Sequence, residues 1–334
     1  LRAMNRIPGV ATHDISAKPR VRGAPDDQVL VLLDGLELYE PYHMKYWDGA
    51  MSVVDPQGVG GVELFTGGFG AEYGDRLAGV MSIRSASPPV QGKTAVGASV
   101  TNLSLESSGG FRGGQGSWLV LARRGFLEYA FAVTDAGNGG ELKPAYWDVF
   151  AKTSYQIAPG HVLTAHLLRT GETLRAVEDD STLIRGRYGS GYAWLTWTAA
   201  LRPALSMETL VSATYLEGDR RGEDDIGEVE NLSVRDQRSL GVLGLSQRWS
   251  WQPTEALLLR WGGDFKVGEA EHSYYRRSTY ARPNFQDYTA PAWSLDLVAA
   301  YRMAVQADAT YLAAKASAEA SREAIPQARA GLLP

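Results

Sequence analysis

The chain has 334 residues, a formal net charge of −5, no cysteine and many glycines (37), tryptophans (9) and tyrosines (16). The missing cysteine excludes disulfides, thiolate metal sites and cysteine nucleophiles. Lysine and arginine are scattered along the sequence, so nucleic acid is not expected as a partner. No run of about 18 apolar residues occurs, and any membrane-spanning segment must therefore be a β-strand.

Short apolar strands separated by glycine-rich turns characterise residues 1 to about 90. Val29–Leu33 reads as a buried strand, and Asp34-Gly35 closes it because this pair tolerates positive φ. Further strands are predicted near residues 62–65 and 79–83. The pattern predicts a small α/β globule dense in turns.

From about residue 91 the sequence alternates with a period of two. Within residues 146–157 the odd positions, such as Trp147, are mostly apolar, and the even ones, such as Asp148 and Lys152, are mostly polar. The same split recurs near residues 190–198 and 257–267. We predict about nine antiparallel strands, each with one apolar face and one polar face.

The connections between these strands differ in length. Tight turns are expected near residues 159–160, 202–203 and 252–253, and long polar loops near residues 125–145, 173–187 and 220–234. Short connections on one side and long ones on the other are typical of outer-membrane barrels. A soluble β-sandwich has no reason to sort its turns in this way.

An alanine-rich stretch begins at Trp293 and predicts a helix that continues to about Ile325. Ser294 suits the N-cap and Asp296 the first turn. Pro326 would stop or kink this helix.

One set of residues in the first stretch, called the plug signature below, consists of Arg22, Gly23, Asp34, Gly35, Glu63, Gly67, Gly68, Tyr73, Gly74, Arg76 and Gly79. Through these residues the stretch resembles the plug domain of TonB-dependent outer-membrane receptors. The resemblance implies a globule inside a barrel of about 22 strands, in the outer membrane of a Gram-negative bacterium and in contact with its lipid. It also implies energised uptake through the TonB complex of the inner membrane. The cargo stays open between a siderophore, cobalamin, an oligosaccharide and a peptide.

The sequence departs from the family pattern in two places. Val59-Gly60-Gly61 stands where the family usually has Ile-Glu-Arg, and the TonB-binding segment is expected to be absent from this chain. Residues 293–334 resemble the opening helix of the TolC family of outer-membrane efflux proteins, which suggests a truncated or fused reading frame. We therefore expect a partial plug at 1–90, a partial barrel at 91–292 and a foreign helix at 293–334.

The predicted fold class is mostly β: a small α/β plug domain, then an incomplete antiparallel transmembrane β-barrel, ending in an α-helix. An efflux component and a soluble β-rich binding module are the alternatives. No enzyme is expected, because Gly-x-Ser-x-Gly and His-Glu-x-x-His motifs are both absent. No cofactor or metal is expected either, since His161 and His166 are five positions apart on a strand and face opposite sides.

An aromatic loop after the Asp-Gly turn is the candidate ligand contact. It contains Tyr39, Tyr42, His43, Tyr46 and Trp47, which offer stacking surfaces and hydrogen bonds. The alternative is that these rings have a structural role and pack between the plug and the barrel wall.

Three charged residues are predicted to hold the plug in place. Arg22, Glu63 and Arg76 are expected to form a buried polar network, because charges inside a lumen must be paired. Asp34 is expected only to cap its own turn.

Overall fold

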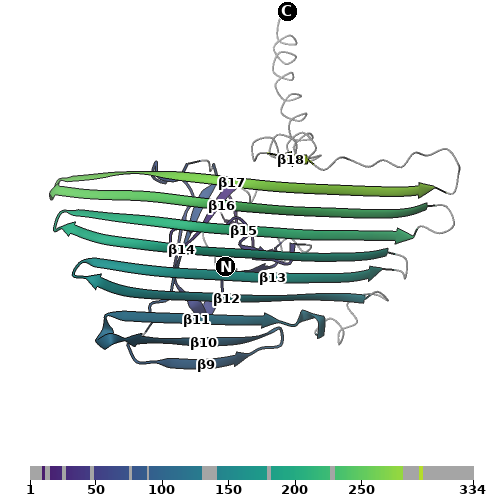
Figure 1. The fold of residues 1–334 in the computed structure, drawn as a ribbon, viewed down its shortest axis with the longest axis horizontal. Helices are drawn as coiled ribbons and strands as arrows, with labels where there is room; N and C mark the ends of the chain where they lie inside the picture. Colours follow the sequence, from purple (N-terminus) through teal and green to yellow (C-terminus); the bar gives the residue numbers. More distant parts are fainter. Residues whose placement is uncertain are drawn as a thin grey trace, which may run out of the picture.

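The computed structural model describes residues 10–11, 16–24, 28–45, 49–74, 77–88, 90–129, 141–178, 182–225, 230–280 and 293–295. These residues form a wide antiparallel sheet and a small strand-rich globule that packs behind it in the view of Figure 1. The globule occupies residues 10–88 and is called the plug from here on. The mostly β fold class is confirmed.

The plug is built around a four-stranded sheet in the order β4-β3-β8-β7. All five residues of the central strand β3 are buried, and β3 pairs in parallel with β8, which fits its unbroken apolar run. The described residues of the plug contain strands and short 3-10 turns but no α-helix, so the helical part of the α/β prediction is not found there. The elements are β1 (Val10–Ala11), β2 (Arg20–Val21), β3 (Val29–Leu33), β4 (Leu36–Glu37), β5 (Tyr42–His43), β6 (Met51–Ser52), η4 (Pro56–Gly58), β7 (Val59–Phe65) and β8 (Gly79–Ser85).

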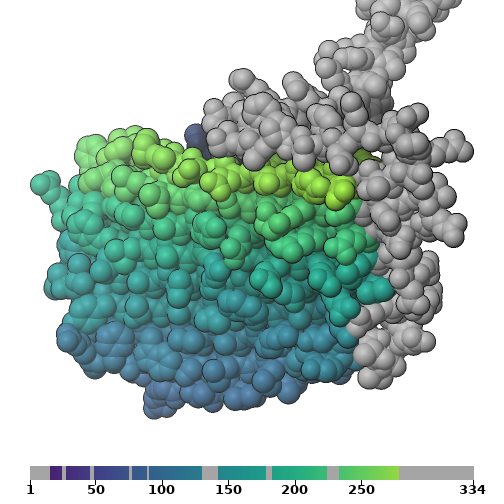
Figure 2. Space-filling view, turned by 45° about the vertical axis from the view of Figure 1, so that its right-hand side comes forward, coloured from purple at the N-terminus to yellow at the C-terminus, as the bar shows by residue number. Residues whose placement is uncertain are grey.

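The large sheet is a simple up-and-down meander in which each strand pairs with the one before it. Its strands are β9 (Lys93–Ala98), β10 (Asn102–Phe111), β11 (Gly116–Gly125), β12 (Glu141–Ala158), β13 (His161–Glu178), β14 (Thr182–Arg202), β15 (Leu205–Asp225), β16 (Glu230–Thr254), β17 (Leu257–Tyr280) and β18 (Trp293–Leu295). The space-filling view shows β9 to β17 as one continuous surface in sequence order (Figure 2).

The strands are longer than the sequence suggested. β12 to β17 contain 18 to 25 residues each, whereas about 9–11 residues suffice to cross a bilayer. The loops expected at 173–187 and 220–234 are therefore wrong, since β13 to β16 extend through most of both ranges. Beyond the bilayer both faces of a strand can be polar, so these strand ends resemble loops in sequence.

One tight turn also lies slightly later than expected. Pro159-Gly160 joins β12 to β13, and residues 203–204 join β14 to β15, close to their predicted places. Residues 252–253, however, belong to β16, where a register shift lies between Trp251 and Thr254. The turn itself is at residues 255–256, because the bulge absorbs Pro253 inside the strand.

The two faces of the sheet differ as the alternation predicts. Even positions of β12, such as Asp148 and Phe150, are buried against the plug, and outward residues such as Leu243 and Phe265 are each 65% exposed. Outward aromatic residues gather near the tight turns, where Trp249 stacks on Trp261 with ring centroids 6.0 Å apart. An outward apolar band edged by aromatic rings is typical of a membrane barrel.

The expected C-terminal helix is wrong at its first residues. Trp293–Leu295 form β18, which pairs with residues 270–272 of β17. The open edge of β17 presents unpaired backbone groups, which an extended segment satisfies better than a helix would. The rest of the predicted helix lies outside the described residues. No helix in the described part of the chain is long and apolar enough to cross a membrane.

Candidate functional site

A plug histidine bridges two carboxylates of the large sheet. His43 of β5 is 2% exposed; its Nε2 contacts Asp148 of β12, and its Nδ1 lies 3.3 Å from Glu172 of β13. Glu172 also accepts hydrogen bonds from the backbone amides of Met44 (2.8 Å) and Lys45 (3.2 Å). We call His43, Asp148, Glu172 and Arg123 the histidine cluster.

Arg123 of β11 completes this cluster from the sheet side. Its Nε donates to Asp148 over 2.8 Å, and its Nη2 donates to the backbone oxygen of Ser52 in the plug over 2.7 Å. Burial disfavours the charged form of His43, but hydrogen bonds to Asp148 and Glu172 outweigh it and raise the His43 pKa above its ordinary value. The cluster therefore joins plug and sheet through charges of both signs.

Asp34 forms a second connection, and the expectation that it only caps its own turn is wrong. Its carboxylate accepts from the Ser85 amide over 2.9 Å, and lies 3.5 Å from Lys152 and 3.3 Å from His166 of the large sheet. Burial opposes its ionisation, yet the hydrogen bonds from His166 and Ser85 and the charge of Lys152 lower the Asp34 pKa to about 2. The contacts and the ionisation of Asp34 thus depend on residues of the large sheet that lie more than a hundred positions away in sequence.

Several residues of the plug signature shape turns and close contacts. Arg22, Gly23, Asp34, Gly35 and Gly68 all have positive φ. A Cβ at Gly67 would lie 3.0 Å from the Arg22 guanidinium, and one at Gly79 would lie 2.8 Å from the backbone oxygen of Phe65. These glycines allow β2, β7 and β8 to approach each other.

The predicted buried network of Arg22, Glu63 and Arg76 is not found. Glu63 pairs with Arg84 at 2.8 Å, but both side chains are more than half exposed. Arg22 is exposed as well, and Arg76 lies outside the described residues. Burial falls instead on Asp34 and His43, which contact the large sheet.

The aromatic loop lies against the inner face of the large sheet. The Tyr192 hydroxyl accepts from the amide of Glu40 over 3.2 Å, Lys45 lies 4.4 Å above the Tyr188 ring, and Lys266 lies 5.8 Å from the Tyr39 ring. Tyr42 is partly buried, while Tyr46 and Trp47 lie outside the described residues. Tyr39, Gly35, Tyr73 and Gly74 line a cavity of about 470 Å³ between the plug and β15–β17.

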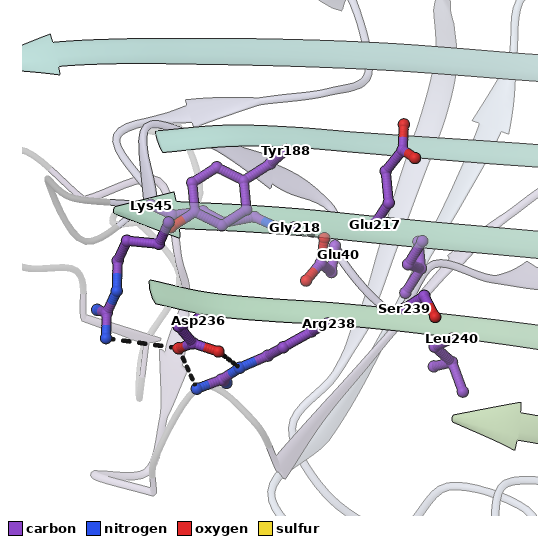
Figure 3. A pocket seen from close by; sticks show the side chains of 11 residues that line it. Glu40, Lys45, Tyr188, Glu217, Gly218, Asp236, Arg238, Ser239 and Leu240 are labelled. Carbon is purple, nitrogen blue, oxygen red and sulfur yellow. Dashed lines mark hydrogen bonds and ion pairs between the residues drawn. The ribbon is translucent and has the colours of Figure 1, made fainter. Parts of the chain in front are cut away.

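A second cavity, of about 430 Å³, lies where this loop meets the sheet. Figure 3 shows Glu40 and Lys45 from the plug beside Tyr188, Asp236 and Arg238 from the strands. Asp236 is 5% exposed and lies 2.8 Å from Arg238, 3.5 Å from Arg220 and 3.1 Å from His272. We call this space the outer cavity, because it lies toward the ends of β15 and β16 away from the tight turns.

Charged and aromatic side chains of both the plug and the sheet line the outer cavity. Among the described residues, no group of three His, Asp or Glu side chains has the geometry to hold a metal ion. A strand-rich globule joined by buried ion pairs to the polar face of an open sheet, whose other face is apolar, is the arrangement of a plugged β-barrel with part of its wall.

Comparisons with known proteins narrow this class. Residues 1–80 match the family model of the TonB-dependent Receptor Plug Domain. The fold is similar to the ferric citrate transporter FecA (TM-score 0.58, 15% identity, 87% of this chain and 48% of that one). It is also similar to the ferric yersiniabactin uptake receptor FyuA from Yersinia pestis (TM-score 0.53, 12% identity, 83% of this chain and 55% of that one). A third similar structure is the pyoverdine receptor FpvA from Pseudomonas aeruginosa PAO1 (TM-score 0.55, 12% identity, 88% of this chain and 47% of that one). No curated protein matches the sequence.

Residues 1–80 therefore match the plug domain of TonB-dependent receptors, and the described fold is similar to that of the plug and part of the barrel in the solved receptors. The chain spans about half the length of the solved receptors that it matches. No comparison bears on the TolC-like interpretation of residues 293–334, which stays a prediction.

Proposed function

We propose that the chain is part of an outer-membrane receptor that takes up a scarce ligand, and that the outer cavity is where this ligand first binds. One observation carries the proposal: the plug loop and the barrel strands line this cavity together. A ligand held there contacts both parts at once, so its binding can change how the plug is held. The TonB complex of the inner membrane is the proposed partner.

Two exposed guanidinium groups in the lining of the outer cavity favour an anionic ligand. Lys45, Arg220 and Arg238 contribute three positive charges to this lining, and Glu40, Glu217 and Asp236 contribute three negative ones. Arg238 and Arg220 are 66% and 46% exposed, so their guanidinium groups stay accessible while they hold Asp236. Arginine binds carboxylates and phosphates in a two-pronged geometry. Ferric citrate, the ligand in the name of the similar transporter FecA, is therefore the first probe that we choose.

Titration of the full chain, folded in detergent micelles, with ferric citrate tests the ligand class. We expect saturable quenching of tryptophan fluorescence and at least about tenfold weaker binding in Arg220→Gln/Arg238→Gln, since hydrogen bonds to charged groups contribute about 1.5–3 kcal/mol each. The matched control is Arg260→Gln/Arg277→Gln, which removes the same charge from β17 outside the cavity. Absent binding, or an equal loss in both double variants, would contradict an anionic ligand at this site.

Uptake is tested separately in cells that export the chain as part of a full-length receptor carrying a TonB-binding segment. Accumulation of radioactive iron from ferric citrate should require both the chain and TonB. Equal accumulation with and without TonB would contradict energised uptake.

The two alternative functions have less support. An efflux component requires long helices, whereas nine strands occupy most of residues 93–280 in the described part of the chain. A soluble binding module requires a polar outer face, whereas outward positions of β17 hold the exposed residues Leu259, Trp261 and Phe265.

A further inference from the structure

The cavity of about 470 Å³ between the plug and β15 to β17 is separate from the outer cavity. On β15 its lining residues fall within 210–214 and those of the outer cavity within 216–220, so it lies nearer the tight turns. We call it the inner cavity. Its volume falls within the range of about 300–1,000 Å³ that is typical of small-molecule sites.

One wall of the inner cavity is apolar and belongs to the plug. Leu30 and Leu32 do not join the core that the other residues of β3 share with the sheet. With Val80 they form a separate hydrophobic cluster, on which Tyr73 packs. Leu30, Leu32, Leu36 and Tyr73 all line the cavity. This wall favours an apolar or aromatic occupant, because burying such a group removes apolar surface from water.

Both cations in the lining of the inner cavity already have a carboxylate partner each. Lys266 of β17 pairs with Glu37 of the plug at 2.6 Å, and Arg248 of β16 pairs with Glu208 of β15 at 2.9 Å. An anionic ligand would have to compete with these carboxylates. The outer cavity differs, because two of its guanidinium groups share the single carboxylate of Asp236.

Two further carboxylates, Glu72 and Asp264, line the inner cavity, and neither has an ion-pair partner in the part of the chain that the structure describes. Arg260 acts electrostatically on the neighbouring Tyr73 but is not part of the lining. The lining therefore offers a ligand two carboxylates and no unpaired cation. Such a lining favours a positively charged group over a negative one.

We propose that the inner cavity binds a compact aromatic ammonium ion. Its ring lies against the leucine wall, and its ammonium group faces Glu72 and Asp264. Faces of aromatic rings also attract cations, and Lys266 Nζ lies 5.8 Å from the centre of the Tyr39 ring in this same cavity. The inference rests on the packing of the plug against β15 to β17, and on neither the ligand nor the transport proposed above.

Three probes with the same aromatic body test the proposal: naphthylmethylammonium, the neutral naphthylmethanol and the anionic naphthoate. Equilibrium dialysis compares the full chain in non-ionic detergent micelles with an equal concentration of empty micelles, so that partition of each probe into detergent cancels. We expect the ammonium probe to bind at least about threefold more tightly than the alcohol and about tenfold more tightly than naphthoate, because exposed ion pairs change an affinity by a few-fold each. Equal affinities, or tighter binding of either other probe, would overturn the proposal.

The role of the two carboxylates is tested by Glu72→Gln/Asp264→Asn. We expect this double variant to bind the ammonium probe about three- to tenfold more weakly and the alcohol with unchanged affinity. The matched control, Glu269→Gln/Glu271→Gln, removes two exposed carboxylates from outward positions of β17. Equal losses in the two double variants would contradict the proposed place of the ammonium group.

The position of the aromatic body is tested by Gly74→Trp. Gly74 lines the inner cavity, and apart from its chain neighbours a Cβ there would meet nothing within 4 Å, so an indole can fill the space. We expect at least about tenfold weaker binding of the ammonium and alcohol probes, with unchanged ferric citrate binding and with the β3 amides still protected from hydrogen exchange. Unchanged probe binding in this variant would overturn the proposal. If the probes bind as expected but ferric citrate does not bind to the unmodified chain, only the ligand proposed for the outer cavity fails.

Discussion

Removal of the charge on Asp148 should loosen the plug more than removal of His43 itself. In Asp148→Asn, the buried cations Arg123 and His43 lose their shared carboxylate, and breaking a buried pair in this way costs about 3–5 kcal/mol. In His43→Gln both carboxylates keep other partners. Asp148 keeps Arg123 at 2.8 Å, and Glu172 keeps two backbone amides. The expected cost is then about 1.5–3 kcal/mol.

The histidine cluster also predicts a pH dependence with a definite sign. The pKa of His43 is raised in the folded state above its ordinary value of 6.5, so the stability that its charge contributes is fully present below pH 6.5. This stability is lost as the pH rises above 6.5 through the folded-state pKa. His43→Gln should lack this loss.

Hydrogen exchange of the backbone amides in β3 and β8 measures the free energy of plug opening. The amides in β12 and β13 serve as an internal reference for the barrel. Equal effects of Asp148→Asn and His43→Gln, or an undiminished loss of protection above pH 6.5 in His43→Gln, would refute the assigned roles of the cluster.

Three further predictions concern other contacts. A Cβ at Gly58 would lie 2.0 Å from the Leu121 side chain, so Gly58→Ala should destabilise the plug by about 1–3 kcal/mol. Adding Leu121→Ala should restore part of this stability, as measured by hydrogen exchange. Additive losses in the double variant would contradict the contact. Phe265→Arg should cost about 2–4 kcal/mol in folding into lipid vesicles if this residue faces the bilayer, and a neutral effect would count against membrane burial. Because the Asp34 pKa is lowered to about 2, its charge stabilises the fold above pH 3.8, and this contribution is lost as the pH falls through about 2. Acid unfolding of Asp34→Asn, followed by tryptophan fluorescence, should lack that step, and an unchanged acid transition would exclude the role of Asp34.

Local patterns were sufficient to predict most of the fold. The alternation between Trp147 and Asp148 along β12 identifies both the strand and its two faces, because side chains alternate strictly. The Asp34-Gly35 turn follows equally from local chemistry, since both residues adopt positive φ. The ends of β13 to β16 were not predicted because they extend beyond the lipid. There the sequence no longer shows the alternation of apolar and polar residues that marks a spanning strand.

The site was less predictable, because its contacts join distant segments. His43 was a candidate ligand contact, but its observed partners Asp148 and Glu172 are more than a hundred positions away. The available signal was an acidic residue on the plug-facing side of a strand. The sequence shows that Asp148 lies on the polar face, but not which plug residue packs against it.

The contacts between plug and barrel combine two kinds of interaction with different consequences for movement. Leu33 and Met81 of the plug share one hydrophobic core with Phe150 and Leu168 of the barrel. Apolar burial is non-directional and tolerates small shifts, whereas His43 and Asp34 fix one relative position through directed bonds. In a lumen that admits water, charges that a moving plug separates become hydrated. Separating them therefore costs less free energy than separating them in a dry core would. Directed bonds thus give the plug one resting position, and the proposed ligand-triggered transport requires that the plug can leave it.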